Sequence, residues 1–255
     1  MNDYRAIAIE AAKGAGAILL QLSKSPLKYK LKSARDIQAE ADLNSESLIK
    51  AKIKAAFPEH KILAEESGEE GADSEYLWVI DPLDGTINYA RGIEEYAVSI
   101  ALCKNGQPIL GVIYQPVLDK LFVAEKGKGA YLNGDKLNMG GESELANCLA
   151  ATDTTSNLEA RSYNFEVLSR VASAVRHVRI FGSSSLHLAR IAQGQIDFYF
   201  KAHCNYWDVA AGIVIIEESG GRVSDMEGQP LTRESDTILV ATSIIYPEAL
   251  NLLAA

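Results

Sequence analysis

The chain has few cysteines and no excess of positive charge. Its 255 residues include only three cysteines, Cys103, Cys148 and Cys204, which are widely spaced and form no C-x-x-C pair. This usage argues against a disulfide scaffold or a cysteine metal site, and it is typical of buried thiols in a reducing compartment. The formal net charge is -9. We therefore expect no broad basic surface that would bind a nucleic-acid polymer.

Long apolar runs and nucleotide-binding glycine motifs are also missing, and we expect no leader segment. The apolar run from Ala15 to Leu22 contains Gln21 and is too short to span a bilayer. Residues 1–5 show no basic region leading into an apolar core. Neither the P-loop nor the Rossmann glycine pattern occurs. We therefore expect a soluble, cytoplasmic protein with no membrane partner.

Histidine metal ligation is not indicated either. The four histidines show no metal-ligand spacing, and they are His60, His177, His187 and His203. We expect surface or packing roles for them.

What the chain does contain is an ordinary globular composition, with 47% hydrophobic and 23% charged residues. Apolar periodicity predicts helices over residues 4–23, 158–175, 182–192, 207–218 and 247–253, and another that follows Asp42 and ends before Pro58. It predicts strands over residues 61–64, 76–81, 97–103, 109–114, 121–124, 148–152, 177–181, 198–200 and 237–242. A loop is expected around Lys28, Lys30, Lys32 and Arg35. This mixture indicates alternating layers of helix and sheet. We divide them into an N-terminal α+β half (1–146) and a C-terminal α/β half (147–255).

The most informative motif is Asp-Pro-Leu-Asp-Gly-Thr at residues 81–86, directly after the apolar run 76–80. A strand that ends on an acid places it at the sheet edge, where α/β proteins bind ligands. Pro82 lacks an N–H, so we expect the strand to stop there. Asp81 and Asp84 repel each other unless a cation or a proton lies between them, and Mg²⁺ prefers oxygen ligands. An Asx-type turn is the alternative interpretation.

Two further acidic positions complete the candidate set. Glu65, with Glu66 beside it, follows strand 61–64, and Asp208 stands at the start of an apolar helix. Taken alone, the glutamates suit a solvated loop and Asp208 suits a helix N-cap. Together with Asp81 and Asp84, these acids provide the carboxylate ligands that a two-metal site contains. Such a site binds both the attacking and the leaving oxygen of a displacement at phosphorus.

The residues after Asp81 offer additional contacts. The Leu83 carbonyl is an oxygen ligand of the kind that Mg²⁺ accepts. Gly85 and Thr86 open a helix and are placed to present N–H groups to a phosphate.

The order of these motifs resembles that of the inositol monophosphatase family. The motifs are Glu65-Glu66-Ser67-Gly68, residues 78–89, and Trp-Asp-Val-Ala-Ala-Gly at residues 207–212 followed by Gly220-Gly221. The family belongs to a set of Mg²⁺-dependent, Li⁺-sensitive phosphomonoesterases that includes fructose-1,6-bisphosphatases and 3′-phosphoadenosine 5′-phosphate phosphatases. The resemblance implies an α/β (α+β) fold, a five-layered α-β-α-β-α sandwich, commonly as a homodimer.

The resemblance also implies a role for each acid. Glu65, Asp81 and the Leu83 carbonyl would hold one Mg²⁺, and Asp81, Asp84 and Asp208 a second, with two or three ions per subunit. Asp42 matches the family acid that pairs with the motif threonine, here Thr86, to position and deprotonate the attacking water. Glu65 is counted with them as catalytic. Ala39 stands where family members usually carry a threonine.

Two features of the sequence bear on how the substrate would be bound. Residues 182–185 read Gly-Ser-Ser-Ser and open a helix. The resemblance implies substrate contacts from Gly182, Ser183 and Ser184, besides Gly85, Thr86 and Asp208; a serine cap without a ligand is the alternative.

Lys201 is the second feature. It stands seven residues before Asp208, where inositol-specific members often carry a glutamate. An ammonium accepts no hydrogen bond but attracts a second phosphate. A solvated lysine at a strand end is the alternative.

We predict a phosphoric monoester hydrolase of the inositol-1-monophosphatase type, in which metal-activated water hydrolyses a small phosphomonoester. The alternative substrates are fructose 1,6-bisphosphate, 3′-phosphoadenosine 5′-phosphate, NADP and histidinol phosphate. A regulatory or binding protein on the same fold is the non-enzyme alternative. The expected partners are the small phosphorylated substrate and a second copy of the chain.

Overall fold

A computed structural model describes residues 3–24, 29–33 and 36–254 of the chain. Its helices are α1 (Tyr4–Leu22), α2 (Glu40–Ala56), α3 (Thr86–Ala90), α4 (Leu158–Ala174), α5 (Ser184–Ala192), α6 (Tyr206–Ser219), α7 (Tyr246–Ala254) and the 3-10 turn η1 (Leu145–Asn147). Its first strands are β1 (Tyr29–Ser33), β2 (Asp36–Ala39), β3 (Lys61–Ala64), β4 (Gly68–Glu70), β5 (Tyr76–Asp84), β6 (Ala97–Lys104), β7 (Gln107–Gln115) and β8 (Lys120–Glu125). The later strands are β9 (Gly129–Leu132), β10 (Asp135–Lys136), β11 (Leu149–Ala151), β12 (His177–Arg179), β13 (Phe198–Ala202), β14 (Gly221–Ser224) and β15 (Thr237–Thr242).

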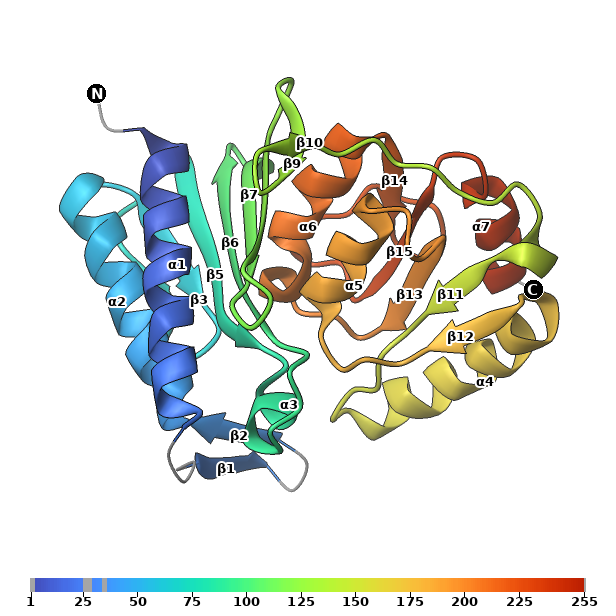
Figure 1. Cartoon of the computed structure of the whole chain (residues 1–255), viewed down its shortest axis with the longest axis horizontal. Helices are drawn as coiled ribbons and strands as arrows, with labels where there is room; N and C mark the ends of the chain where they lie inside the picture. The colour runs from blue at the N-terminus through green and yellow to red at the C-terminus, as the bar shows by residue number, and fades with distance from the viewer. Residues whose placement is uncertain (1–2, 25–28, 34–35, 255) are drawn as a thin grey trace.

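Helices and strands alternate in five layers (Figure 1). The helices α1 and α2 cover one face of an eight-stranded sheet with the order β10-β9-β8-β7-β6-β5-β3-β4. The helices α5 and α6 fill the space between its other face and a five-stranded sheet with the order β12-β11-β13-β15-β14. The helices α4 and α7 cover the outer face of that second sheet. The predicted α-β-α-β-α sandwich is confirmed.

The outer helix α1 illustrates how the sequence builds a layer. Asp3 caps it by accepting a hydrogen bond from Arg5 N at 2.9 Å. Small residues on one face, with Leu19, are fully buried against the large sheet. The opposite face is exposed, as expected for a helix with a single apolar stripe.

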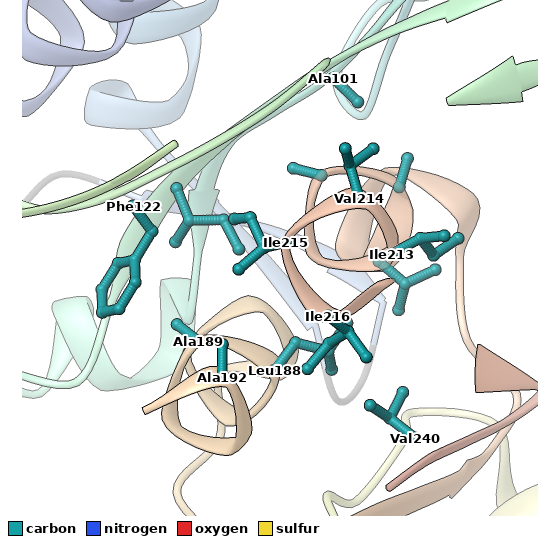
Figure 2. Packing of buried hydrophobic residues seen from close by; sticks show 14 of the residues in the cluster. Ala101, Phe122, Leu188, Ala189, Ala192, Ile213, Val214, Ile215, Ile216 and Val240 are labelled. Atoms are coloured by element: carbon teal, nitrogen blue, oxygen red, sulfur yellow. The ribbon is translucent and has the colours of Figure 1, made fainter. Parts of the chain in front are cut away.

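The central helix α6 is apolar on nearly all sides because it lies between the two sheets (Figure 2). Its Val214 and Ile215 are buried in one cluster with Phe122 of the large sheet and Val240 of the small one. Gly111 of β7 permits a very close approach, because a Cβ there would lie 2.1 Å from the Ala211 carbonyl oxygen. This packing fixes the first turn of α6, which carries Asp208. Since the cluster joins residues on both sides of position 146, the boundary between two halves stays a prediction.

The structure corrects the predicted end of β5. The strand does not stop at Pro82 but continues to Asp84 through an irregularity in its pairing with β6, where Asp81 pairs with Ser99 and Asp84 with Ala97. Two residues of β5 thus oppose one of β6. A bulge tolerates proline because the extra residue makes no regular ladder hydrogen bond.

The loop predicted between the first two helices is also wrong in part. β1 and β2 form an antiparallel hairpin with Lys30 opposite Gln38 and Leu31 opposite Ile37. Every residue of β1 is exposed, so the sequence offered no apolar alternation that would have revealed it. Lys28 and Arg35 of the predicted loop lie outside the described residues.

Short strands without an apolar signal were also missed, namely β4, β9, β10 and β14. The three cysteines are buried and free, as predicted. Among the described helices, we find none with the length and apolar character needed to cross a membrane.

Candidate active site

The candidate acids meet in one cavity of about 200 Å³. It is lined by Glu65, Asp81, Leu83, Asp84, Gly85, Thr86, Ile87, Thr154, Thr155, Ser156, Arg161, Lys201, His203, Asn205 and Asp208. These residues come from the ends of β3, β5, β11 and β13 and from the first turns of α3, α4 and α6. Carboxylates from three separate segments of the sequence, at Glu65, at Asp81 with Asp84, and at Asp208, therefore share one space.

The end of β5 positions Asp81 and, through a backbone hydrogen bond, Glu65. Asp81 is anchored by its own turn, because Leu83 N donates to its Oδ1 at 3.0 Å. Glu65 lies next to this strand, since its backbone N–H donates to the Ile80 carbonyl at 3.1 Å. Gly85 follows with a φ of 96°, a left-handed conformation that favours glycine and turns the chain into α3.

Asp84 is held by the first turn of α5. Its Oδ2 accepts hydrogen bonds from Ser183 Oγ at 2.7 Å, and from the N–H at 2.7 Å and the hydroxyl of Ser185. Ser184 N donates to the other oxygen at 3.3 Å. The helix N-terminus thus binds an anion, and that anion is a side chain of the protein. The predicted substrate contacts of Gly182, Ser183 and Ser184 stay a prediction.

Burial and mutual repulsion dominate the electrostatics of the acids. Burial, then the charges of Glu65, Asp84 and Asp208, raise the pKa of Asp81 well above its usual range. Burial and Asp208 raise the pKa of Asp84 to about 6. Burial, with Asp208 and Glu66, raises the pKa of Glu65 to about 8 against the opposing charge of Lys32. The positive charges near these carboxylates are too few to offset their burial and their mutual repulsion.

Two lysines stand at the ends of the acid cluster. Lys32 Nζ lies 3.0 Å from Glu65 Oε1 and 2.6 Å from Glu66 Oε1. Lys201 Nζ lies 3.4 Å from Asp208 Oδ2. In the residues that the structure describes, no three Asp, Glu, His or Cys side chains are arranged so that they could hold a metal ion as they stand. The donor set still fits Mg²⁺, because it consists of hard oxygens whose repulsion a divalent cation relieves. The ligand assignment stays a prediction.

Asp42 and Thr86 form the expected pair. Thr86 Oγ1 donates to Asp42 Oδ1 at 3.2 Å and to the Leu83 carbonyl at 3.0 Å. Ala39 N donates to the second Asp42 oxygen at 2.6 Å, which satisfies the start of α2. Burial and the charge of Glu66 raise the pKa of Asp42 to about 7. The pair is therefore present, while its role in positioning water stays a prediction.

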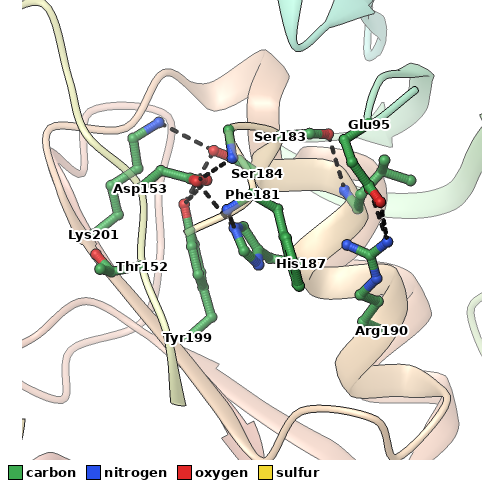
Figure 3. A network of polar contacts seen from close by, with 12 residues as sticks. Glu95, Thr152, Asp153, Phe181, Ser183, Ser184, His187, Arg190, Tyr199 and Lys201 are labelled. Carbon is green, nitrogen blue, oxygen red and sulfur yellow. Dashed lines mark hydrogen bonds and ion pairs between the residues drawn. The ribbon is translucent and has the colours of Figure 1, made fainter. Parts of the chain in front are cut away.

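A second polar network, absent from the sequence-based predictions, is connected to the cavity residue Lys201 through Ser184 (Figure 3). Asp153 is its centre: its Oδ1 contacts His187 Nε2 at 3.0 Å and accepts from Gly182 N at 2.8 Å. Tyr199 donates to the other oxygen at 3.2 Å and contacts Ser184 Oγ at 3.0 Å. Although burial opposes it, His187 lowers the pKa of Asp153. The packing role expected for His187 is confirmed, because its side chain is fully buried.

Two alternative interpretations from the sequence are wrong. Asn205 is the N-cap residue of α6, and Asp208 lies within the first turn of that helix rather than capping it. Lys201 is only 8% exposed, so it is not a solvated lysine. Burial lowers its pKa, but Asp208 and Asp153 outweigh burial and raise the pKa above its usual range.

The cavity also contains two basic residues that were not predicted to belong to the site, and for one of them, His203, a surface or packing role was expected. Arg161 of α4 and His203 after β13 line it together with Lys201. These three side chains are basic, in contrast to the acids of the site. Arg161 Nε donates to the Thr155 carbonyl at 2.6 Å, and His203 Nδ1 lies 2.8 Å from Asp236. His203 comes directly after β13, which ends at the cavity, whereas Arg161 lies within α4 and nothing in the sequence around it indicates its place in the cavity.

The fold and this site place the chain in a known class. It belongs to the inositol monophosphatase family, whose sequence profile matches residues 1–255. Membership of this family supports phosphatase activity.

Named relatives make the comparison more specific. The chain is 33% identical to a "Fructose-1,6-bisphosphatase/inositol-1-monophosphatase" of Thermotoga maritima, over 86% of this chain and 82% of that protein. It is 35% identical to the "Nus factor SuhB" of Pasteurella multocida, over 98% of this chain and 96% of that protein. Its structure resembles the crystal structure of the extragenic suppressor protein suhB from Bartonella henselae, with a TM-score of 0.93, 34% identity and 97% coverage of both chains.

Proposed function

We propose that the protein is a Mg²⁺-dependent phosphomonoesterase that hydrolyses a small, inositol monophosphate-like ester. The observation that carries this proposal is the meeting of Glu65, Asp81, Asp84 and Asp208 at one cavity, with raised pKa values for the first three. Buried carboxylates that repel one another favour a bound cation, and perturbed pKa values gather at functional sites.

The chain offers oxygen ligands for two ions. Glu65, Asp81 and the Leu83 carbonyl would hold one Mg²⁺, and Asp81, Asp84 and Asp208 the other. When bound, Mg²⁺ supplies the charge that activates water and stabilises the phosphoryl group during displacement. In the structure Lys32 donates to one oxygen of Glu65 and Thr86 donates to the Leu83 carbonyl. The second Glu65 oxygen and the second lone pair of the carbonyl would still be available to an ion.

Asp42 and Thr86 are suited to handle the proton of the attacking water. The threonine hydroxyl lies between the Asp42 carboxylate and the Leu83 carbonyl. A pKa of about 7 allows Asp42 to take up a proton near neutral pH. Thr86 would orient the water, and its proton would pass to Asp42. No nucleophilic side chain has to form a bond to phosphorus in this scheme.

The remaining contacts concern the substrate. Gly85 and Thr86 line the cavity beside the acids, where their N–H groups would meet the phosphate. Gly182, Ser183, Ser184, Lys201 and Asp208 are the proposed contacts to the rest of the substrate. We also propose two or three Mg²⁺ per subunit, inhibition by Li⁺, a homodimer and a cytoplasmic location, all supported by family membership alone.

A second candidate substrate class is a sugar bisphosphate. The cavity carries the cationic side chains of Arg161 and Lys201 besides its acids. A guanidinium binds a phosphate through two parallel hydrogen bonds, so Arg161 favours a substrate with a second anionic group.

A substrate panel tests the proposed function. Phosphate release is measured from inositol 1-phosphate, fructose 1,6-bisphosphate and 3′-phosphoadenosine 5′-phosphate, with Mg²⁺ and with a chelator. We expect release from at least one of them in Mg²⁺ only. No release from any ester would remove the enzyme and leave the regulatory or binding protein, an alternative that the name of the Pasteurella relative keeps open.

A further inference from the structure

The strand β13 aims Lys201 into the middle of the molecule. Its alternate residues Phe198 and Phe200 are buried in the cluster beneath α4 and α7, on the outer side of the small sheet. Side chains alternate along a strand, so Tyr199 and Lys201 take the inner face, toward α5 and α6. Lys201 is therefore directed at the acid cluster by the same register that buries the phenylalanines.

The ammonium of Lys201 is held by groups of the protein. It donates to Ser184 Oγ at 3.0 Å (Figure 3) and to Asp208 Oδ2 at 3.4 Å. With 8% of its surface exposed, the residue has little contact with water. A buried charge is stable only when it is paired and hydrogen-bonded. The side chain is thus fixed, and its charge is directed to Asp208.

We propose that Lys201 is a built-in cation that replaces part of the divalent charge at Asp208, so that the protein holds a Mg²⁺ ion there only weakly. This inference rests on the proposed function, since it concerns the same site. A Mg²⁺ ion held by Asp208 would lie near this fixed ammonium and be repelled by it. Lys32, at the other end of the cluster, pairs with Glu65 and Glu66, but its side chain is 25% exposed against 10% for Lys201, so water screens its charge better.

Isothermal titration calorimetry with Mg²⁺ alone, without substrate, tests this inference. The variants are Lys201→Met, which removes the charge and keeps the length, and Lys201→Arg, which keeps the charge. Lys104→Met is the control: it also removes one ion-paired lysine, the partner of Glu75. Lys104 lies opposite Tyr76 in the pairing of β6 with β5, at the far end of β5 from the acids. Thermal unfolding followed by circular dichroism shows that each variant is folded.

We expect Lys201→Met to tighten the weakest Mg²⁺ binding step at least tenfold, with Lys201→Arg and Lys104→Met within threefold of the wild type. If Lys201→Met does not fold, Lys201→Gln takes its place with the same expectation. Unchanged Mg²⁺ affinity in the charge-removing variant, with phosphatase activity present in the wild type, overturns this inference alone. An absence of Mg²⁺ binding in every variant overturns the proposed metal centre and this inference with it.

Discussion

Two groups of buried polar residues lie side by side in this protein and differ in their balance of charge. Around Asp153, an imidazole, a backbone N–H and a phenol satisfy the carboxylate, and its pKa is lowered. Around Asp81, three other carboxylates contribute repulsion, and its pKa is raised. Both acids are almost completely buried. Burial alone therefore does not distinguish scaffold from site.

This difference in charge balance indicates which buried acids belong to a functional site. A buried acid with its full set of partners stabilises the fold, because breaking the set would leave an unpaired charge. A buried acid among like charges destabilises the fold until something binds. The Asp153 network joins β11, α5 and β13 and orients Ser184, which in turn contacts Lys201. The balanced network thus supports the unbalanced one.

The strongest test of the comparison is Asp81→Asn. We expect a loss of Mg²⁺-dependent phosphate release of about 10³-fold, roughly 4 kcal/mol, because the side chain shared by both proposed ions loses its charge. The asparagine resembles the protonated acid, so the free energy of unfolding without metal should not fall. Turnover and urea unfolding measure the two effects. Asp73→Asn, at a fully exposed side chain, is the control; near-normal turnover of Asp81→Asn would refute the ligand assignment.

The reverse is expected of Asp153→Ala. Removing this carboxylate takes away the interior hydrogen-bond partner of His187 and the Gly182 N–H, and one of the two contacts of Tyr199, so the free energy of unfolding should fall by about 3 kcal/mol. Urea unfolding at pH 7 provides the measurement. The double variant Asp153→Ala/His187→Leu should recover part of the loss, because it no longer buries an unpaired imidazole. A fall of less than about 1 kcal/mol in the single variant would show that the network does not support the fold.

A smaller effect concerns pH and metal together. The folded-state pKa values of Glu65 and Asp84 are raised to about 8 and about 6, above the usual values of about 4 in unfolded chains. These groups bind protons more tightly in the folded state. Their contribution to stability is thus greatest below pH 4 and is lost as the pH rises through 6 and 8.

Mg²⁺ should oppose this loss. At a concentration of 100 Kd it should stabilise the wild type by about 2.7 kcal/mol, and the same Mg²⁺ concentration should stabilise it more at pH 8 than at pH 5.5, where protons compete for the carboxylates. Thermal unfolding at both pH values, with Mg²⁺ or with a chelator, measures the difference. An equal shift at both pH values would contradict the acid cluster as the binding site.

Local sequence determined much of this protein. Strands, helix caps and helices are short-range structures, so their signals lie within a few positions of the sequence. Examples are the apolar run followed by Asp81 and Asp84, the glycine stop at Gly220 and the helical spacing of small residues. Local patterns therefore predicted the alternation of helix and sheet and, to within one residue, the ends of α6, whereas the pairing of Asp42 with Thr86 was implied by the family resemblance. The bulge at Pro82 and the exposed hairpin of β1 and β2 left no such local signal.

Only the tertiary structure decided which buried charges are balanced. Nothing near Asp153 in the chain indicates that His187 and Tyr199 will surround it, and nothing near Lys201 indicates Ser184 and Asp208 as its partners. These neighbours come from different strands and helices. The physical reason is that the energy of a buried charge depends on the groups within a few ångströms in space, and the packing of the two sheets around α5 and α6 selects those groups.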